Sequence, residues 1–239
     1  MKTAILIDGG FFIKRLQKLV PASCATPQGM AEEICRYALR DLKLLNDKSE
    51  KKRELYRIFF YDCPPLEKKI RNPVSQKEED LSRSATALFR KELHNILRTK
   101  RKLALRLGKI ADYGAWQLHP KILKKLLRGE IEVSALNEDD VSYQMTQKGV
   151  DMKLGLDISS LSYGGKIDQI ILIAGDSDFV PAAKQARRAG IDFVLDPMWS
   201  NINADLQEHI DGIISASKKP ETEPQPDADN KPRKTNKPA

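Results

Sequence analysis

The stretch Ile170-Ile171-Leu172-Ile173-Ala174-Gly175-Asp176-Ser177-Asp178-Phe179 indicates how the chain folds. Its first half is a continuous apolar run that ends at a glycine, which is typical of a parallel strand covered on both faces. Two carboxylates, Asp176 and Asp178, follow at once. In open α/β sheets, ligands bind beyond the carboxyl ends of the strands. We therefore expect an acidic site at this strand end, completed by residues from other parts of the chain.

Other segments repeat the pattern of a short apolar strand followed by a helix. Residues 3–8 form an apolar run that ends at Asp8, and the two glycines that follow allow a tight turn into a helix. This alternation predicts an α/β fold with a parallel sheet and helices on both faces. We expect strands at 3–8, 55–62, 103–110, 141–145, 170–174 and 191–195, and helices at 11–16, 27–45, 75–99, 120–127, 149–163, 178–189 and 204–214.

Length and composition predict how the 239 residues are divided. We expect one domain at 1–217 with a basic helical segment at about 75–130, and a disordered tail at 218–239 that is poor in large apolar residues. Three cysteines without a CxxC pair argue against a disulfide scaffold or a zinc site. No apolar run approaches the roughly 18 residues of a membrane span, and none suits a signal peptide. We therefore expect a cytoplasmic protein with no membrane partner.

Carboxylates stand where predicted strands end or helices begin, at Asp8, Asp151 and the pair Asp176 and Asp178. Each one alone could merely cap a helix or complement its dipole. Because parallel strands end at the same edge of a sheet, however, Asp8 and Asp176 can converge there, and Asp151 can join them. Carboxylates hold Mg²⁺ or Mn²⁺ without His or Cys ligands. Such a metal can activate water against a phosphodiester.

Three further polar residues are candidates for contacting the site carboxylates without binding the metal themselves: Asp62, Asp157 and Ser177. Asp62 ends the strand at 55–62, but it also precedes two prolines and could simply start their turn. Asp157 follows Asp151 by six residues, which is roughly 240° around a helix, so the two do not share a face. Ser177 could equally cap the helix that follows it.

At these carboxylates the sequence resembles NYN domains of the PIN-like nuclease superfamily, with the LabA-like (DUF88) branch the most similar. The resemblance spans about 1–214 and implies a Rossmann-like PIN fold, an acidic Mg²⁺ or Mn²⁺ site and RNA cleavage. By matching position, it implies metal binding by Asp8, Asp151 and Asp176, and a catalytic role for Asp178. It is carried by Ile5-Leu6-Ile7-Asp8-Gly9, by Lys148-Gly149-Val150-Asp151 through Asp157, and by Gly175-Asp176-Ser177-Asp178-Phe179-Val180-Pro181.

Two alternatives to a ribonuclease have to be weighed. Many NYN relatives have Asn three residues after the first Asp, where this chain has Phe11. A non-catalytic RNA-binding or scaffold protein on the same fold is therefore the second hypothesis. A phosphatase of the haloacid dehalogenase type is the third, because Gly175-Asp176-Ser177-Asp178 resembles its last acidic motif. That chemistry needs a second Asp two residues after the nucleophile, and Gly10 occupies this place after Asp8.

Positive charge favours a polyanionic partner. The net charge is +8 and the pI about 9.3. Residues 83–109 contain nine Lys or Arg against one acidic residue. Such clusters neutralise phosphates, although a solvated helix face would look the same. Tyr113 and Trp116 could stack on unpaired bases. We expect single-stranded RNA to be the partner, bound by Arg98, Lys100, Arg101, Lys102, Lys124 and Lys125.

Overall fold

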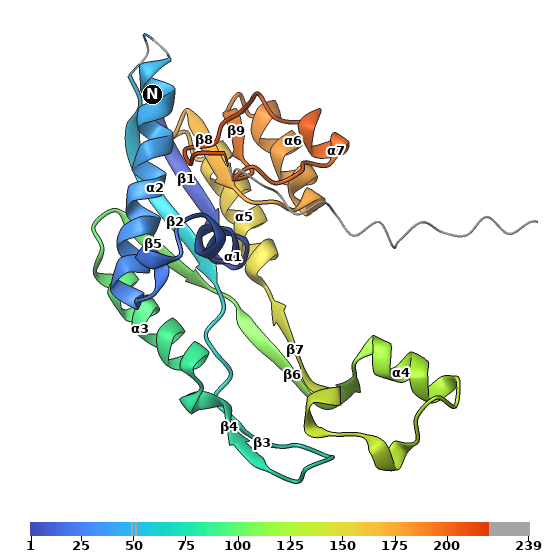
Figure 1. Ribbon diagram of the computed structural model, residues 1–239. Coiled ribbons are helices and arrows are strands. Elements are labelled where there is room, and N and C mark those ends of the chain that lie inside the picture. The colour runs from blue at the N-terminus through green and yellow to red at the C-terminus, as the bar shows by residue number, and fades with distance from the viewer. Residues whose placement is uncertain (49, 51, 220–239) are drawn as a thin grey trace, which may run out of the picture.

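The computed structural model describes residues 1–48, 50 and 52–219, without the side chain of Ser177. Among these residues the central element is a six-stranded parallel sheet with the strand order β10-β9-β8-β1-β2-β5 (Figure 1). It confirms the predicted α/β fold. From residue 220 on, the predicted disordered tail lies outside the described residues. The sheet consists of β1 (Lys2–Asp8), β2 (Glu54–Asp62), β5 (Leu103–Leu107), β8 (Gln169–Ile173), β9 (Asp192–Asp196) and β10 (Gly212–Ile213).

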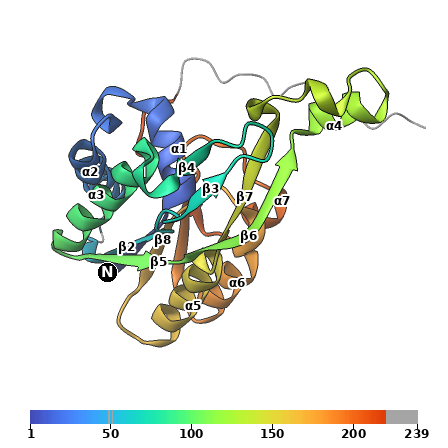
Figure 2. The same ribbon diagram turned by 90° about the horizontal axis from the view of Figure 1, so that it is seen from below.

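Helices cover both faces of the sheet because its central strands are apolar on both sides. Alternate residues of β1 enter two different cores, with Ile5 and Ile7 in one and Ala4 and Leu6 in the other. The first core is closed by α1 (Gly9–Leu19), α2 (Pro27–Asp47) and α3 (Ala85–Thr99). The second is closed by α5 (Val150–Tyr163), α6 (Val180–Arg188) and α7 (Ala204–Gln207), as Figure 2 shows from below.

A long antiparallel ribbon projects from the body beside the sheet (Figure 1). It pairs β6 (Lys109–Leu118) with β7 (Val141–Lys148), and α4 (Pro120–Leu127) lies in the connection at its far end. We call residues 109–148 the arm. At about 3.3 Å per residue, the ten residues of β6 extend about 30 Å from the end of the parallel sheet. A short hairpin of β3 (Lys69–Arg71) and β4 (Glu78–Asp80) lies beside the arm.

The structure corrects two predicted helices. The helix expected at 75–99 begins only at Ala85, where Ser84 is the N-cap and its hydroxyl accepts the Ala87 N–H. The residues before it form β4, so the basic segment at 75–130 alternates strands with helices. The helix expected at 204–214 ends at Gln207. Parallel pairing of β10 with β9, with Gly212 opposite Val194, takes the following residues into the sheet instead.

Two predicted strands also differ. The strand expected at 103–110 is divided at Gly108 into β5 and β6. A Cβ atom at Gly108 would lie 2.7 Å from the Lys148 carbonyl oxygen, so this close crossing of the chain requires glycine. The strand expected at 141–145 continues to Lys148 and pairs with β6 outside the parallel sheet. None of the helices in the described residues is long and apolar enough to cross a membrane.

Candidate functional site

Asp8 lies at the carboxyl end of β1, where the strand turns directly into α1. Its Oδ1 accepts hydrogen bonds from the Gly10 and Phe11 N–H groups at 3.0 and 3.3 Å, so the carboxylate also caps α1. Burial raises the pKa of Asp8, and the negative charges of Asp151 and Asp62 add to this effect. The two backbone hydrogen bonds oppose it. Asp8 is therefore a positioned carboxylate within the electrostatic range of other acids.

Asp151 reaches the same region from the opposite helical layer. Gly149 has φ +79°, and this left-handed turn directs the chain from β7 into α5, which carries Asp151 in its first turn. Partial burial raises the pKa of Asp151, and the charges of Asp176 and Asp178 raise it further. Carboxylates carried by β1, by α5 and by the segment after β8 thus act electrostatically on one another.

Asp176 and Asp178 follow β8, the strand next to β1 in the sheet. Ile7 of β1 is paired with Ile173 of β8, so Asp8 and Asp176 both lie just beyond the carboxyl ends of adjacent strands. Both carboxylates after β8 are exposed. Asp176 Oδ1 accepts the Asp178 N–H at 3.1 Å. Asp176 therefore caps the turn that follows it and also belongs to the acidic group.

The Phe11 ring lies between the first turn of α1 and the segment after β8. Its edge occupies the space that a Cβ atom at position 175 would need, so Gly175 is the residue that lets this ring approach. Phe11 also packs against the buried core below α1. An apolar side chain therefore lies beside the carboxylates.

Asp62 is held by an ion pair that the sequence did not reveal. It is 1% exposed, and its Oδ2 accepts Arg90 Nη1 and faces His94 Nε2 at 2.8 Å. Burial alone would raise the pKa of Asp62, but the His94 hydrogen bond and the Arg90 charge hold it below its usual value. Asp62 Oδ1 has no hydrogen-bond partner among the described residues. The separation of Arg90 and His94 by four residues on α3 was the available sequence signal.

Asp157 lies about one and two-thirds turns along α5 from Asp151 and makes different contacts. Its Oδ2 accepts Tyr61 Oη at 2.8 Å and Arg106 Nε at 3.0 Å. Burial and the Asp157 charge both raise the pKa of Tyr61, which stays a neutral donor. Asp157 therefore ties α5 to β2 and β5. The side chain of Ser177 lies outside what the structure describes.

Comparison with known families bears on this acidic group. Residues 108–216 match the NYN domain family. No curated protein matches the chain. The matched range includes Asp151, Asp157, Asp176 and Asp178. Asp8 and Asp62 precede it. NYN domains belong to the PIN-like nuclease superfamily, with which the observed parallel α/β fold agrees.

The donor chemistry of this acidic group fits a hard divalent cation, because its side chains are carboxylates whose negative charges raise one another's pKa. A bound cation would relieve that repulsion. Among the described residues, however, no group of three or more His, Cys, Asp or Glu side chains is already arranged to hold a metal.

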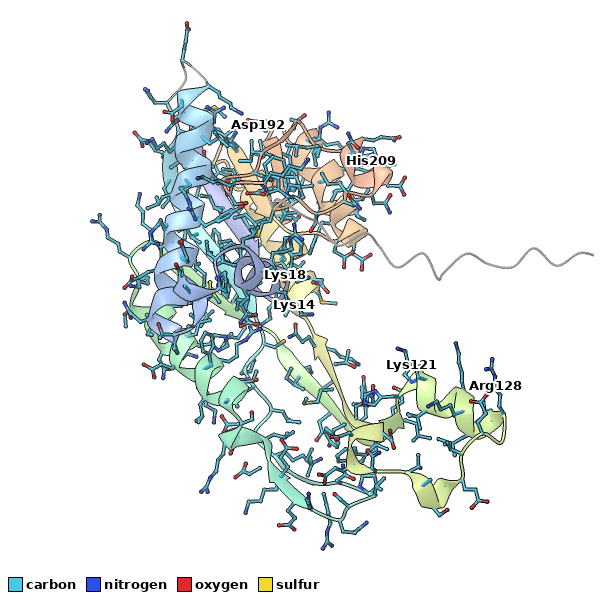
Figure 3. All side chains as sticks on the ribbon, viewed as in Figure 1. Lys14, Lys18, Lys121, Arg128, Asp192 and His209 are labelled. Carbon is cyan, nitrogen blue, oxygen red and sulfur yellow. The ribbon has the colours of Figure 1, made fainter. Side chains whose placement is uncertain are left out.

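The expected RNA-binding residues lie in two places away from the carboxylates. Arg98 is in the last turn of α3, and Lys100, Arg101 and Lys102 form the turn into β5. They therefore stand at the amino end of β5, roughly 17 Å of strand from the edge that carries Asp62. Lys124 and Lys125 lie on α4, whose neighbours Lys121 and Arg128 are labelled at the far end of the arm in Figure 3.

Other cations lie nearer to the acidic edge. Lys109 and Lys148 are paired in register at the root of the arm, directly after β5 and before α5. Lys148 Nζ lies 5.1 Å from the centre of the Tyr113 ring, which is exposed. Trp116 instead packs edge-to-face on Tyr143. Lys14 and Lys18 extend along α1, which begins at Asp8 (Figure 3).

Proposed function

We propose that this protein is a metal-dependent ribonuclease that hydrolyses phosphodiester bonds of single-stranded RNA. The observation that carries the proposal is the convergence of carboxylates from separate elements at the carboxyl edge of the parallel sheet, where Asp151 raises the pKa of Asp8 and is itself affected by Asp176 and Asp178. Mutual repulsion of this kind destabilises an empty site and favours a cation. The NYN match to residues 108–216 supports the same chemistry.

In this proposal Asp8, Asp151 and Asp176 hold Mg²⁺ or Mn²⁺, which when bound supplies an activated water and offsets the charge on the phosphate. Asp8 is already oriented by the Gly10 and Phe11 N–H groups. Asp178 is exposed beside Asp176, where it can orient the attacking water or accept its proton. The ion pair of Arg90 with Asp62 keeps the charge of Asp62 fixed behind Asp8.

We further propose that RNA crosses the root of the arm to reach this edge. Lys109 and Lys148 can neutralise backbone phosphates there, and the exposed Tyr113 ring offers a surface on which an unpaired base can stack. The cations at the turn between α3 and β5 would then contact only RNA that extends around the body.

The test is to incubate purified protein with 5′-labelled single-stranded RNA and Mn²⁺, then to repeat the assay with EDTA. Cleavage should require the metal and should fall at least 100-fold in Asp151→Asn and in Asp176→Asn. Asp47→Asn, which removes one exposed carboxylate from α2, is the matched control and should cleave normally. Cleavage that survives Asp176→Asn would refute this assignment of the site.

A second candidate function is RNA binding without cleavage. Two observations favour it: the Phe11 ring against Gly175, and the lack of a complete metal-ligand group among the described residues. This protein would bind RNA with steep salt dependence and show no Mn²⁺-dependent cleavage. Phe11→Asn discriminates the two, because it places an amide beside Asp8. New cleavage in the variant alone would identify the natural chain as a binding protein.

A further inference from the structure

Among the described residues, none covers α4, the helix at the end of the arm, closely enough to bury any of its side chains. α4 has eight residues, all of them described, and none is buried. A helix this short has little stability in water unless tertiary contacts support it. Its apolar residues fall on one side, at positions 122, 123, 126 and 127. Leu127 is 79% exposed, Leu123 is 43% exposed and the nearby Val133 is 74% exposed. Leu123 and Leu127, which lie one turn apart on α4, form an apolar patch that faces water at the end of the arm.

The charge around this patch does not favour a nucleic acid. Residues 119–140 contain four Lys or Arg and five Asp or Glu. The cations lie on α4, whereas the acids follow it at positions 130, 132 and 138–140. A polyanion approaching α4 would also meet these carboxylates. The end of the arm is therefore dipolar, with an apolar patch between its charges, and such a surface suits a protein with complementary charges.

A groove of about 480 Å³ lies on the same arm, between its strands and the β3–β4 hairpin. Its apolar lining includes Ile70, Leu81, Trp116 and Met145. Its acidic lining includes Glu78, Glu79 and Asp139, whereas Glu138 is paired with Lys77 at 2.8 Å. The groove therefore offers an apolar floor and an acidic margin, which is the complement of an amphipathic helix with Lys residues beside its apolar side.

The groove and α4 both belong to the far part of the arm. Leu118 pairs with Val141 at the end of the ribbon, and α4 begins two residues later. In both views α4 projects from the arm on the side away from β3 and β4 (Figures 1 and 2). A second copy related by a two-fold axis near the end of the arm could place its α4 in this groove while its own groove receives the first α4. In such a dimer the contact between α4 and the groove is made twice, once in each direction, as two-fold symmetry requires.

We propose that the protein forms a symmetric dimer through its arms, with α4 of each copy docked in the acidic groove of the other. Leu123 and Leu127 enter the groove against Trp116 and Met145. Lys124 and Lys125, which the sequence associated with RNA, lie at the margin against Glu78 and Glu79. The dimer would bury the apolar patch and stabilise a helix that has little support in the monomer. This inference does not depend on the proposed ribonuclease activity.

The test is sedimentation velocity of the full chain over a wide concentration range. Wild type should sediment as a dimer at high concentration, and Leu123→Glu/Leu127→Glu should remain a monomer at least 100-fold above the wild-type dissociation constant. Leu156→Glu is the matched control, because Leu156 is 63% exposed on α5, away from the arm. Circular dichroism verifies that each variant is folded. A monomeric wild type at every concentration would overturn the proposal.

A charge exchange tests the groove itself. Glu79→Lys and Lys125→Glu should each weaken self-association at least tenfold, and an equimolar mixture of the two variants should recover part of the loss in a heterodimer. Undiminished dimerisation of Glu79→Lys would overturn the assignment of the groove. The α4 variants Leu123→Glu/Leu127→Glu and Lys125→Glu should also be tested for RNA affinity in a mobility-shift assay. If they lose RNA affinity while their mass in solution equals that of wild type, α4 is an RNA contact and the dimer proposal fails.

Discussion

A buried pair of carboxyl groups makes the stability of this protein depend on pH in a predictable way. Asp41 of α2 and Asp196 at the end of β9 are both fully buried. Asp196 accepts hydrogen bonds from Tyr37 Oη at 2.8 Å, from Met198 N at 2.6 Å and from Ser215 Oγ at 3.1 Å. Neither carboxyl oxygen of Asp41 has a hydrogen-bond partner among the described residues. Burial raises the pKa of both carboxyl groups, so the pair retains a proton at a pH where an exposed aspartic acid has lost it.

Burial raises the pKa of Asp41 well above its usual value, and the charge of Asp196 raises it further. In the unfolded chain an aspartic acid titrates near pH 4. Between that pH and the folded pKa, the folded protein binds more protons than the unfolded chain, so the free energy of unfolding decreases as the pH rises. The decrease approaches about 1.4 kcal/mol per pH unit for one proton. The stabilisation is complete below about pH 4 and is lost as the pH rises through the folded pKa.

Asp41→Asn removes this dependence, because the amide carries no charge and can donate a hydrogen bond to Asp196. The variant should gain stability relative to wild type as the pH rises. For each pH unit inside this window, the gain approaches about 1.4 kcal/mol. For a chain of this size that corresponds to roughly 3–6 °C in Tm per pH unit.

Urea unfolding at pH 5, 6, 7 and 8 measures the difference between variant and wild type directly. Asp47→Asn on the same helix is exposed and is the matched control, whose difference from wild type should not change with pH. A difference between Asp41→Asn and wild type that is the same at every pH would refute the reasoning. So would a variant that becomes relatively less stable as the pH rises.

Three further predictions concern the acidic site. Arg90→Leu should lower the free energy of unfolding by about 3–5 kcal/mol in urea titrations because it leaves the buried Asp62 charge with less compensation, and adding Asp62→Asn should restore part of the loss. Gly175→Ala should cost about 1–3 kcal/mol by forcing the Phe11 ring aside, and in a double-mutant cycle it should cost much less in a Phe11→Ala background. If the site binds metal, Mn²⁺ at 100 times its Kd should raise the free energy of unfolding by about 2.7 kcal/mol in thermal melts, but Asp151→Asn melted at the same concentration should gain far less.

The pattern of apolar runs and carboxylates was sufficient to predict the centre of this protein. β1 and β8 are apolar on both sides, so their burial in a parallel sheet could be inferred without knowing their neighbours. Because parallel strands end at one edge, the pattern also predicted that Asp8 and Asp176 lie at the same edge of the sheet. Only the fold shows that their strands, β1 and β8, are adjacent. Most helix positions were predictable because amphipathic periodicity is a local property.

Tertiary contacts decided the features that depend on residues far apart in the chain. Helical spacing continues before Ala85, yet β4 pairs with β3 there, and pairing with β9 draws Gly212 into the sheet. The sequence identified Asp62, but only the fold shows that Arg90 holds it. The sequence could count the cations of the basic segment, but not show that Arg98 and residues 100–102 stand at the edge opposite Asp8 whereas Arg90 pairs with Asp62. The local periodicity of the sequence shows which side of a helix or strand is apolar. Contacts between residues far apart in the chain decide which other element that side packs against.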